Sequence, residues 1–84
     1  MKKDERELSL SQYVFLKYIL AEKLAEVAKA ARAAGRRAPN GNSMQARNIS
    51  ELLDSSPDDV PQGVQNIAKS IFSRNRRIAY HAWG

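Results

Sequence analysis

Apolar residues recur at steps of three and four along the first part of the chain, which is the spacing of one side of a helix. Alanine, leucine, lysine and glutamate dominate this stretch, and all are strong helix formers. Ser9 or Ser11 suits the start, while Gly35 followed by Pro39 suits the end. The pattern predicts one long helix from about Leu8 to Ala34. Its first apolar side consists of Tyr13, Leu16, Leu20, Leu24, Val27 and Ala31.

The same helix is predicted to carry apolar residues on a second side. Phe15 and Ile19 lie roughly opposite Leu20 and Leu24 at about 100° per residue. A helix that is apolar on two sides packs between other elements or is buried in an oligomer. In so short a chain we expect a protein interface, either with a partner protein or in a homodimer. Its predicted residues are Tyr13, Val14, Phe15, Tyr18, Ile19 and, near the other end, Trp83, with packing of Trp83 on the core as the alternative.

Two further helices are predicted after the turn-forming stretch Ala38–Ser43. A short helix is expected over about 44–54, and Ser55–Asp59 breaks it. The last helix is expected over about 61–82, where Pro61 fits the first turn. No segment of the sequence is predicted to form a β-strand. The predicted fold is all-α, a single domain over 1–84, with the two long helices packed as a hairpin and the short helix between them.

The polar side of the last helix carries residue types that bind bases and phosphates. A second basic cluster borders the Pro-Asn-Gly turn. The formal net charge of +5 and the isoelectric point of about 9.9 favour an acidic partner, either nucleic acid or an acidic protein surface. The alternative is a solvated face that only maintains solubility. The candidate nucleic-acid-binding residues are Gln62, Gln65, Asn66, Lys69, Ser73, Arg74, Arg76 and Arg77 on the last helix, and Arg36, Arg37 and Arg47, next to Arg32, around the turn.

The last two helices loosely resemble a helix-turn-helix motif. The connection Ser55–Val60 is longer than the usual turn of that motif. Glu51, Asp58 and Asp59 would also repel phosphates if the last helix entered a DNA groove. The resemblance therefore extends to the order of the elements and not to the details of the motif.

Catalytic and metal-binding chemistry is not expected. The chain has no cysteine and a single histidine, His81, and its four glycines form no phosphate-binding motif. Asp58 and Asp59 fit the role of helix caps better than that of paired catalytic acids. We therefore predict a non-enzyme with no cofactor, no metal and no small-molecule substrate.

The sequence predicts a cytoplasmic protein without a membrane span, since no stretch approaches about 20 apolar residues. A membrane-surface role is the weakest option, because Glu22 and Glu26 interrupt the basic side of the first helix. The leading hypothesis is a small basic regulator that binds nucleic acid. The alternative is an interaction module or inhibitor, of the kind that phages and plasmids encode, which binds a larger host protein complex and modulates it.

Overall fold

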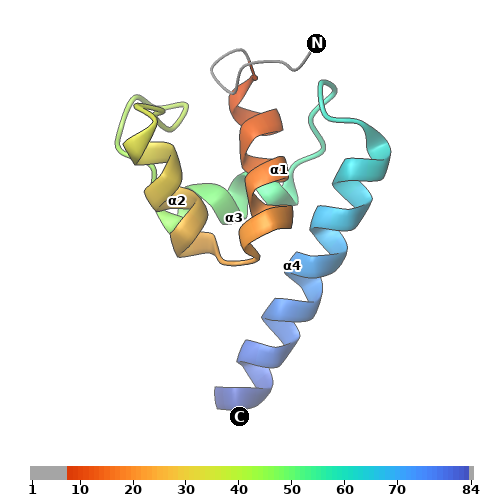
Figure 1. Ribbon diagram of the computed structural model, residues 1–84. Helices are drawn as coiled ribbons and strands as arrows, with labels where there is room; N and C mark the ends of the chain where they lie inside the picture. The colour runs from red at the N-terminus through yellow and green to blue at the C-terminus, as the bar shows by residue number, and fades with distance from the viewer. Residues whose placement is uncertain (1–7, 84) are drawn as a thin grey trace.

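The computed structural model describes the backbone of residues 8–83 and the side chains of residues 8–77. Over this range the chain forms α1 (Leu10–Ala21), α2 (Leu24–Ala33), α3 (Ala46–Asp54) and α4 (Gln62–Trp83), as Figure 1 shows. The predicted all-α class is confirmed, but with four helices in place of three. Within the described residues the only bridge between extended segments is the isolated pair Arg37 and Ser43.

The prediction of one helix over 8–34 is wrong, because the chain turns at Glu22 and Lys23. Glu22 has φ 57°, in the left-handed region, and its amide donates to the carbonyl of Tyr18 at 2.7 Å. Helix α4 holds this turn from the side. The Asn75 amide donates to the Glu22 carbonyl at 3.0 Å and to the Tyr18 hydroxyl at 3.1 Å. The Arg74 guanidinium pairs with the Glu22 carboxylate at 2.8 Å.

The turn at Glu22 and Lys23 determines which apolar residues of the predicted helix reach the core. A straight helix would direct one of its two apolar sides to solvent, whereas the turn lets apolar residues of both shorter helices reach one core, although Leu16 and Leu20 stay exposed. Phe15 from α1 and Val27 and Ala31 from α2 are all fully buried in that core. Packing therefore overrides the high helix propensity of Ala21-Glu22-Lys23-Leu24.

Helix α1 lies at the centre and packs against each of the other three helices, with α2 and α4 on its two sides (Figure 1). Helices α1 and α4 run in the same direction. Near their starts the Gln12 amide donates to the Asp59 carbonyl at 2.8 Å, and farther along Tyr18 contacts Asn75. The expected hairpin of two long antiparallel helices is therefore not found.

The core contains most of the residues that the sequence assigned to a protein interface. Tyr13, Val14, Phe15 and Tyr18 are buried, so their prediction as exposed interface residues is wrong. Tyr18 packs edge-on against Phe72, with ring centroids 5.9 Å apart. Ile19 is half-buried against this core, and the side chain of Trp83 lies outside the described residues. The side chains left exposed are instead Leu16 (40%), Leu20 (79%) and Ile67 (53%).

Local signals fix the ends of the helices much as predicted. Ser9 caps α1, because its hydroxyl accepts from the Gln12 amide while the Gln12 side chain accepts from the Ser9 amide. Gly35 follows α2 at φ 75°, which lets the Arg36 amide reach back to the Ala31 carbonyl at 2.9 Å. The chain then turns tightly and returns to start α3 beside the end of α2.

Candidate nucleic-acid interface

The polar side of α4 is less available to a ligand than the sequence predicted. Gln65 is buried, and its side-chain amide donates to the carbonyls of Pro57 at 2.8 Å and Val60 at 2.9 Å. It holds the α3–α4 loop and cannot reach a base edge, so its prediction as a base-contacting residue is wrong. Gln62 and Asn66 are exposed and hydrogen-bond to each other at 2.9 Å.

Lys69 also has a structural role. Its ammonium group donates to the carbonyls of Leu53, at 2.9 Å, and Ser55. These two residues lie at the end of α3, where carbonyl groups lack partners within the helix. Lys69 is half-buried there, with its ammonium 5.8 Å from the centre of the Phe15 ring. A phosphate would have to replace bonds that already satisfy this charge.

The arginines of α4 stand beside carboxylates. Arg74 pairs with Glu22, and Arg76 lies 3.7 Å from Asp54 while stacking over the Phe72 ring. Ser73 and Arg77 are exposed on the same helix. Both ion pairs are more than half exposed or close to it, so each is weak. The neighbouring acids nonetheless reduce the positive potential that this face offers to a polyanion.

A second basic surface has no such acids in its stretch of chain. Residues 27–50 contain five basic residues and neither aspartate nor glutamate. This stretch covers most of α2, the loop after it and the start of α3. We call this surface the arginine end. Its basic residues are Lys29, Arg32, Arg36, Arg37 and Arg47.

Three of these arginines surround the turn after α2. Arg32 donates to the Met44 carbonyl at 2.7 Å, and this bond links the end of α2 to the chain just before α3. Arg36 stacks over the Tyr13 ring, 4.8 Å from its centroid. Arg37 donates to the Gly41 carbonyl at 3.3 Å. A guanidinium has five N–H donors, so the one carbonyl bond of Arg32 and of Arg37 leaves other donors of these two side chains for a ligand.

The turn encloses a shallow hollow between these side chains. A cavity of about 90 Å³ is lined by Arg32, Gly35, Arg36, Arg37 and Ser43. A wider one of about 320 Å³ adjoins it and is lined by Leu10, Ala34, Gly35, Arg36 and Arg37. Guanidinium groups around a hollow beside a serine hydroxyl form the donor set that binds phosphate oxygens.

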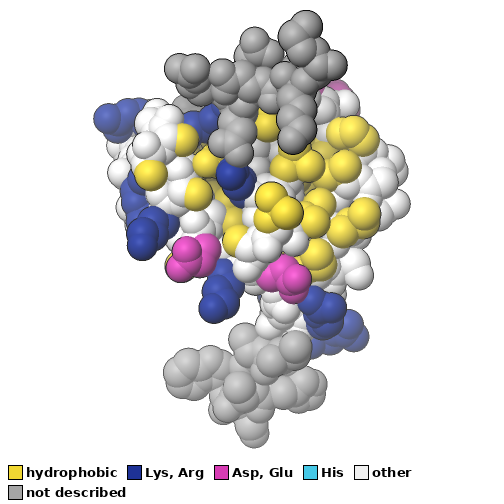
Figure 2. Space-filling view, viewed as in Figure 1, with side chains coloured by type: hydrophobic (Ala, Val, Ile, Leu, Met, Phe, Trp, Pro, Cys, Tyr) yellow, Lys and Arg dark blue, Asp and Glu magenta, His cyan; other side chains and the backbone are white. Residues whose placement is uncertain are grey.

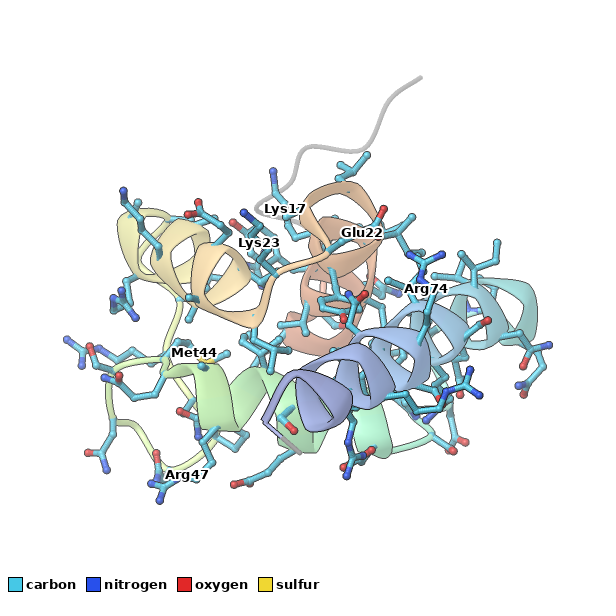
Figure 3. The ribbon with its side chains drawn as sticks, turned by 90° about the horizontal axis from the view of Figure 1, so that it is seen from below. Lys17, Glu22, Lys23, Met44, Arg47 and Arg74 are labelled. Carbon is cyan, nitrogen blue, oxygen red and sulfur yellow. The ribbon has the colours of Figure 1, made fainter. Side chains whose placement is uncertain are left out.

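The two charged surfaces lie on different sides of the molecule. In Figure 2 basic side chains occupy the α2 side, while apolar side chains cover the side of α1 and α4. In Figure 3 Met44 and Arg47 lie at one side, and Glu22 and Arg74 lie toward the other. The structure thus brings the predicted Arg36 and Arg37 together, with Arg47 at the start of α3, and separates them from the predicted residues of α4.

Sequence reasoning missed Lys29. It lies three residues before Arg32 in α2, so these two side chains lie on the same side of the helix, whereas Arg36 lies beyond the end of α2. Lys29 is exposed there. The acid-free run over 27–50 was the signal that would have found it.

An apolar groove lies between α1 and α4, away from the arginine end. It has a volume of about 220 Å³ and is lined by Leu8, Gln12, Leu16, Val60, Pro61 and Val64. The exposed Leu20 and Ile67 follow Leu16 and Val64 by one helical turn, on α1 and α4 respectively.

The chain matches no protein-family model, no curated protein and no solved structure. Within the described residues no helix has the length and apolar character needed to cross a membrane. Among the described side chains, no three of the metal-binding types (histidine, cysteine, aspartate and glutamate) come together in a group.

Proposed function

We propose that the protein is a small nucleic-acid-binding regulator that holds phosphate groups at the arginine end. The observation that carries the proposal is that Arg32, Arg36 and Arg37 line one hollow after α2. They belong to the stretch 27–50, which contains five basic residues and neither aspartate nor glutamate. Arg47 pairs with Glu51 at 3.9 Å, with both side chains largely exposed. Such a pair exchanges readily for a phosphate.

The helix dipoles contribute little to the electrostatic potential of the arginine end, so its charged side chains determine the sign of that potential. The start of α3 directs positive helix-dipole charge toward the loop, and the end of α2 directs negative charge there. These two contributions oppose each other. The positive potential therefore depends on the five basic side chains, and contacts to phosphates rather than to base edges are expected to dominate.

A helix-turn-helix mode is not part of this proposal. Gln65 is buried and Lys69 already bonds the end of α3. The connection between α3 and α4 spans Ser55–Pro61 and carries Asp58 and Asp59, both exposed. Insertion of α4 into a groove would bring these carboxylates toward phosphates, where repulsion lowers affinity.

The proposal is tested by fluorescence anisotropy with a labelled duplex DNA and an RNA of the same sequence. If three or four of the cations contact phosphates, affinity falls roughly 100-fold between about 50 and 200 mM salt. Poly-glutamate serves as the control polyanion, because it offers carboxylates in place of phosphates. Binding to poly-glutamate that equals binding to both nucleic acids would favour an acidic protein partner. Flat titrations with all three at low salt would contradict the proposal.

The alternative function is a module that docks on a larger protein complex and alters its activity. The apolar groove between α1 and α4 is the feature that favours it. Under that function a variant with aspartate at Leu20 would lose the partner, while variants of the arginine end would keep it. Cross-linking from position 20 in cells, followed by mass spectrometry, distinguishes a foreign partner from a second copy of the chain.

A further inference from the structure

The side of the molecule away from the arginine end is an apolar face without a partner in the described chain. We call it the α1–α4 face, and it combines the groove with the exposed Leu20 and Ile67. Leu20 is 79% exposed and Ile67 53% exposed. Figure 2 shows apolar side chains gathered over α1 and α4. Contiguous apolar surface of this kind marks an interaction site, whereas single exposed leucines are ordinary.

The two ends of this face carry opposite charge. Helices α1 and α4 run in the same direction, so both start at one end of the face and proceed toward the other. At the start lie Asp58 and Asp59, both exposed. At the far end lie Lys23 and Arg74, with Glu22 paired to Arg74, so these three side chains together carry a charge of +1. Along α4, Arg74 lies 12 residues after Gln62, a rise of roughly 18 Å.

We propose that the α1–α4 face binds a second copy of this chain about a two-fold axis. A two-fold axis places the acidic start of each copy against the basic end of the other, and it pairs the uncharged middle with itself. The exposed Leu16, Leu20 and Ile67 then cover one another. The same axis turns both arginine ends outward, where they remain accessible. The inference does not depend on the proposed function, because nucleic acid would bind a different side.

The mass of the protein in solution tests the apolar part of the interface. Sedimentation equilibrium of the full chain is expected to give twice its 9.4 kDa mass at high concentration. Leu20→Asp is expected to yield a monomer with an unchanged circular dichroism spectrum, because Leu20 is exposed within one copy. Ala25→Asp, at another exposed position, is the control and is expected to remain a dimer. A wild-type monomer up to about 0.5 mM would overturn the proposal, as would a Leu20→Asp dimer.

Charge reversal tests the orientation of the two copies. One chain carries Asp58→Lys and Asp59→Lys, and a second carries Lys23→Glu and Arg74→Glu. Each is expected to self-associate at least about tenfold more weakly than the wild type, because like charges meet at both ends. An equimolar mixture is expected to form the heterodimer, since each end then faces its opposite charge. Failure of the mixture to associate while both chains stay folded would overturn the two-fold arrangement.

Discussion

At the scale of single residues, a side chain's role depends on what folds back over it. Gln65 follows the polar stripe of the last helix closely enough to be predicted as a base-contacting residue. The sequence does not reveal that the loop Ser55–Pro61 returns across this position and that its carbonyls need donors. Lys69 shows the same effect, since its charge serves the end of α3. Arg37 and Arg47 remain exposed, so their predicted role in binding nucleic acid stays a prediction.

Replacing Gln65 with alanine is expected to destabilise the fold. The substitution leaves the Val60 carbonyl without its side-chain donor and the Pro57 carbonyl with only the 3.4 Å bond from the Val60 amide, which costs about 1–3 kcal/mol. Urea unfolding followed by circular dichroism measures the change in the free energy of unfolding. Gln62→Ala is the matched control, because Gln62 is exposed, and its cost is expected to stay within about 0.5 kcal/mol. Equal costs for the two variants would contradict the structural role of Gln65.

At the scale of elements, the sequence predicts a helix end wherever residues close to that end determine it. The cap at Ser9, the stop at Gly35 and the boundaries of α3 and α4 follow from residue types that act within a few positions. The turn at Glu22 has no such signal, since neither glycine nor proline is present. It arises from long-range contacts with Asn75 and Arg74 on α4, which no local pattern contains.

Glu22→Gly tests this turn through the sign of its effect. Glycine adopts the left-handed conformation without the penalty that glutamate pays, and only an exposed ion pair is lost. We expect the free energy of unfolding to rise by up to about 1 kcal/mol. Lys29→Gly, inside α2, is the control and is expected to cost about 0.7 kcal/mol. A similar loss in Glu22→Gly would indicate a continuous helix through position 22.

At the scale of the whole molecule, the sequence predicts the class of fold but not which apolar side becomes the core. Two apolar sides were visible on the first helical segment, and either was able to pack inward. The structure buries Phe15 and Tyr18 and leaves Leu16 and Leu20 outside, because the turn at Glu22 sets the orientation of α1. The surplus apolar surface inferred from the sequence therefore persists, but on other residues than those predicted.

The distribution of charge on the surface was also only partly predictable from the sequence, because it depends on how the helices pack. Net charge and the two basic clusters follow from composition, whereas the choice between them depends on which arginines meet carboxylates after folding. Arg74 and Arg76 acquire Glu22 and Asp54 as neighbours, which lie 52 and 22 positions earlier in the chain. Arg36 and Arg37 line one hollow, and the stretch 27–50 to which they belong contains neither aspartate nor glutamate.

The most direct test of the arginine end compares two double variants that lose the same charge. Arg37→Ala with Arg47→Ala and Arg76→Ala with Arg77→Ala each lower the net charge of +5 by two. Duplex DNA affinity at about 50 mM salt is expected to fall at least tenfold in the first variant, with the salt slope reduced by about 2. It is expected to stay within about twofold of the wild type in the second. Equal losses of affinity would mean that net charge alone drives binding. A larger loss in the second variant would mean that α4, and not the arginine end, binds the DNA.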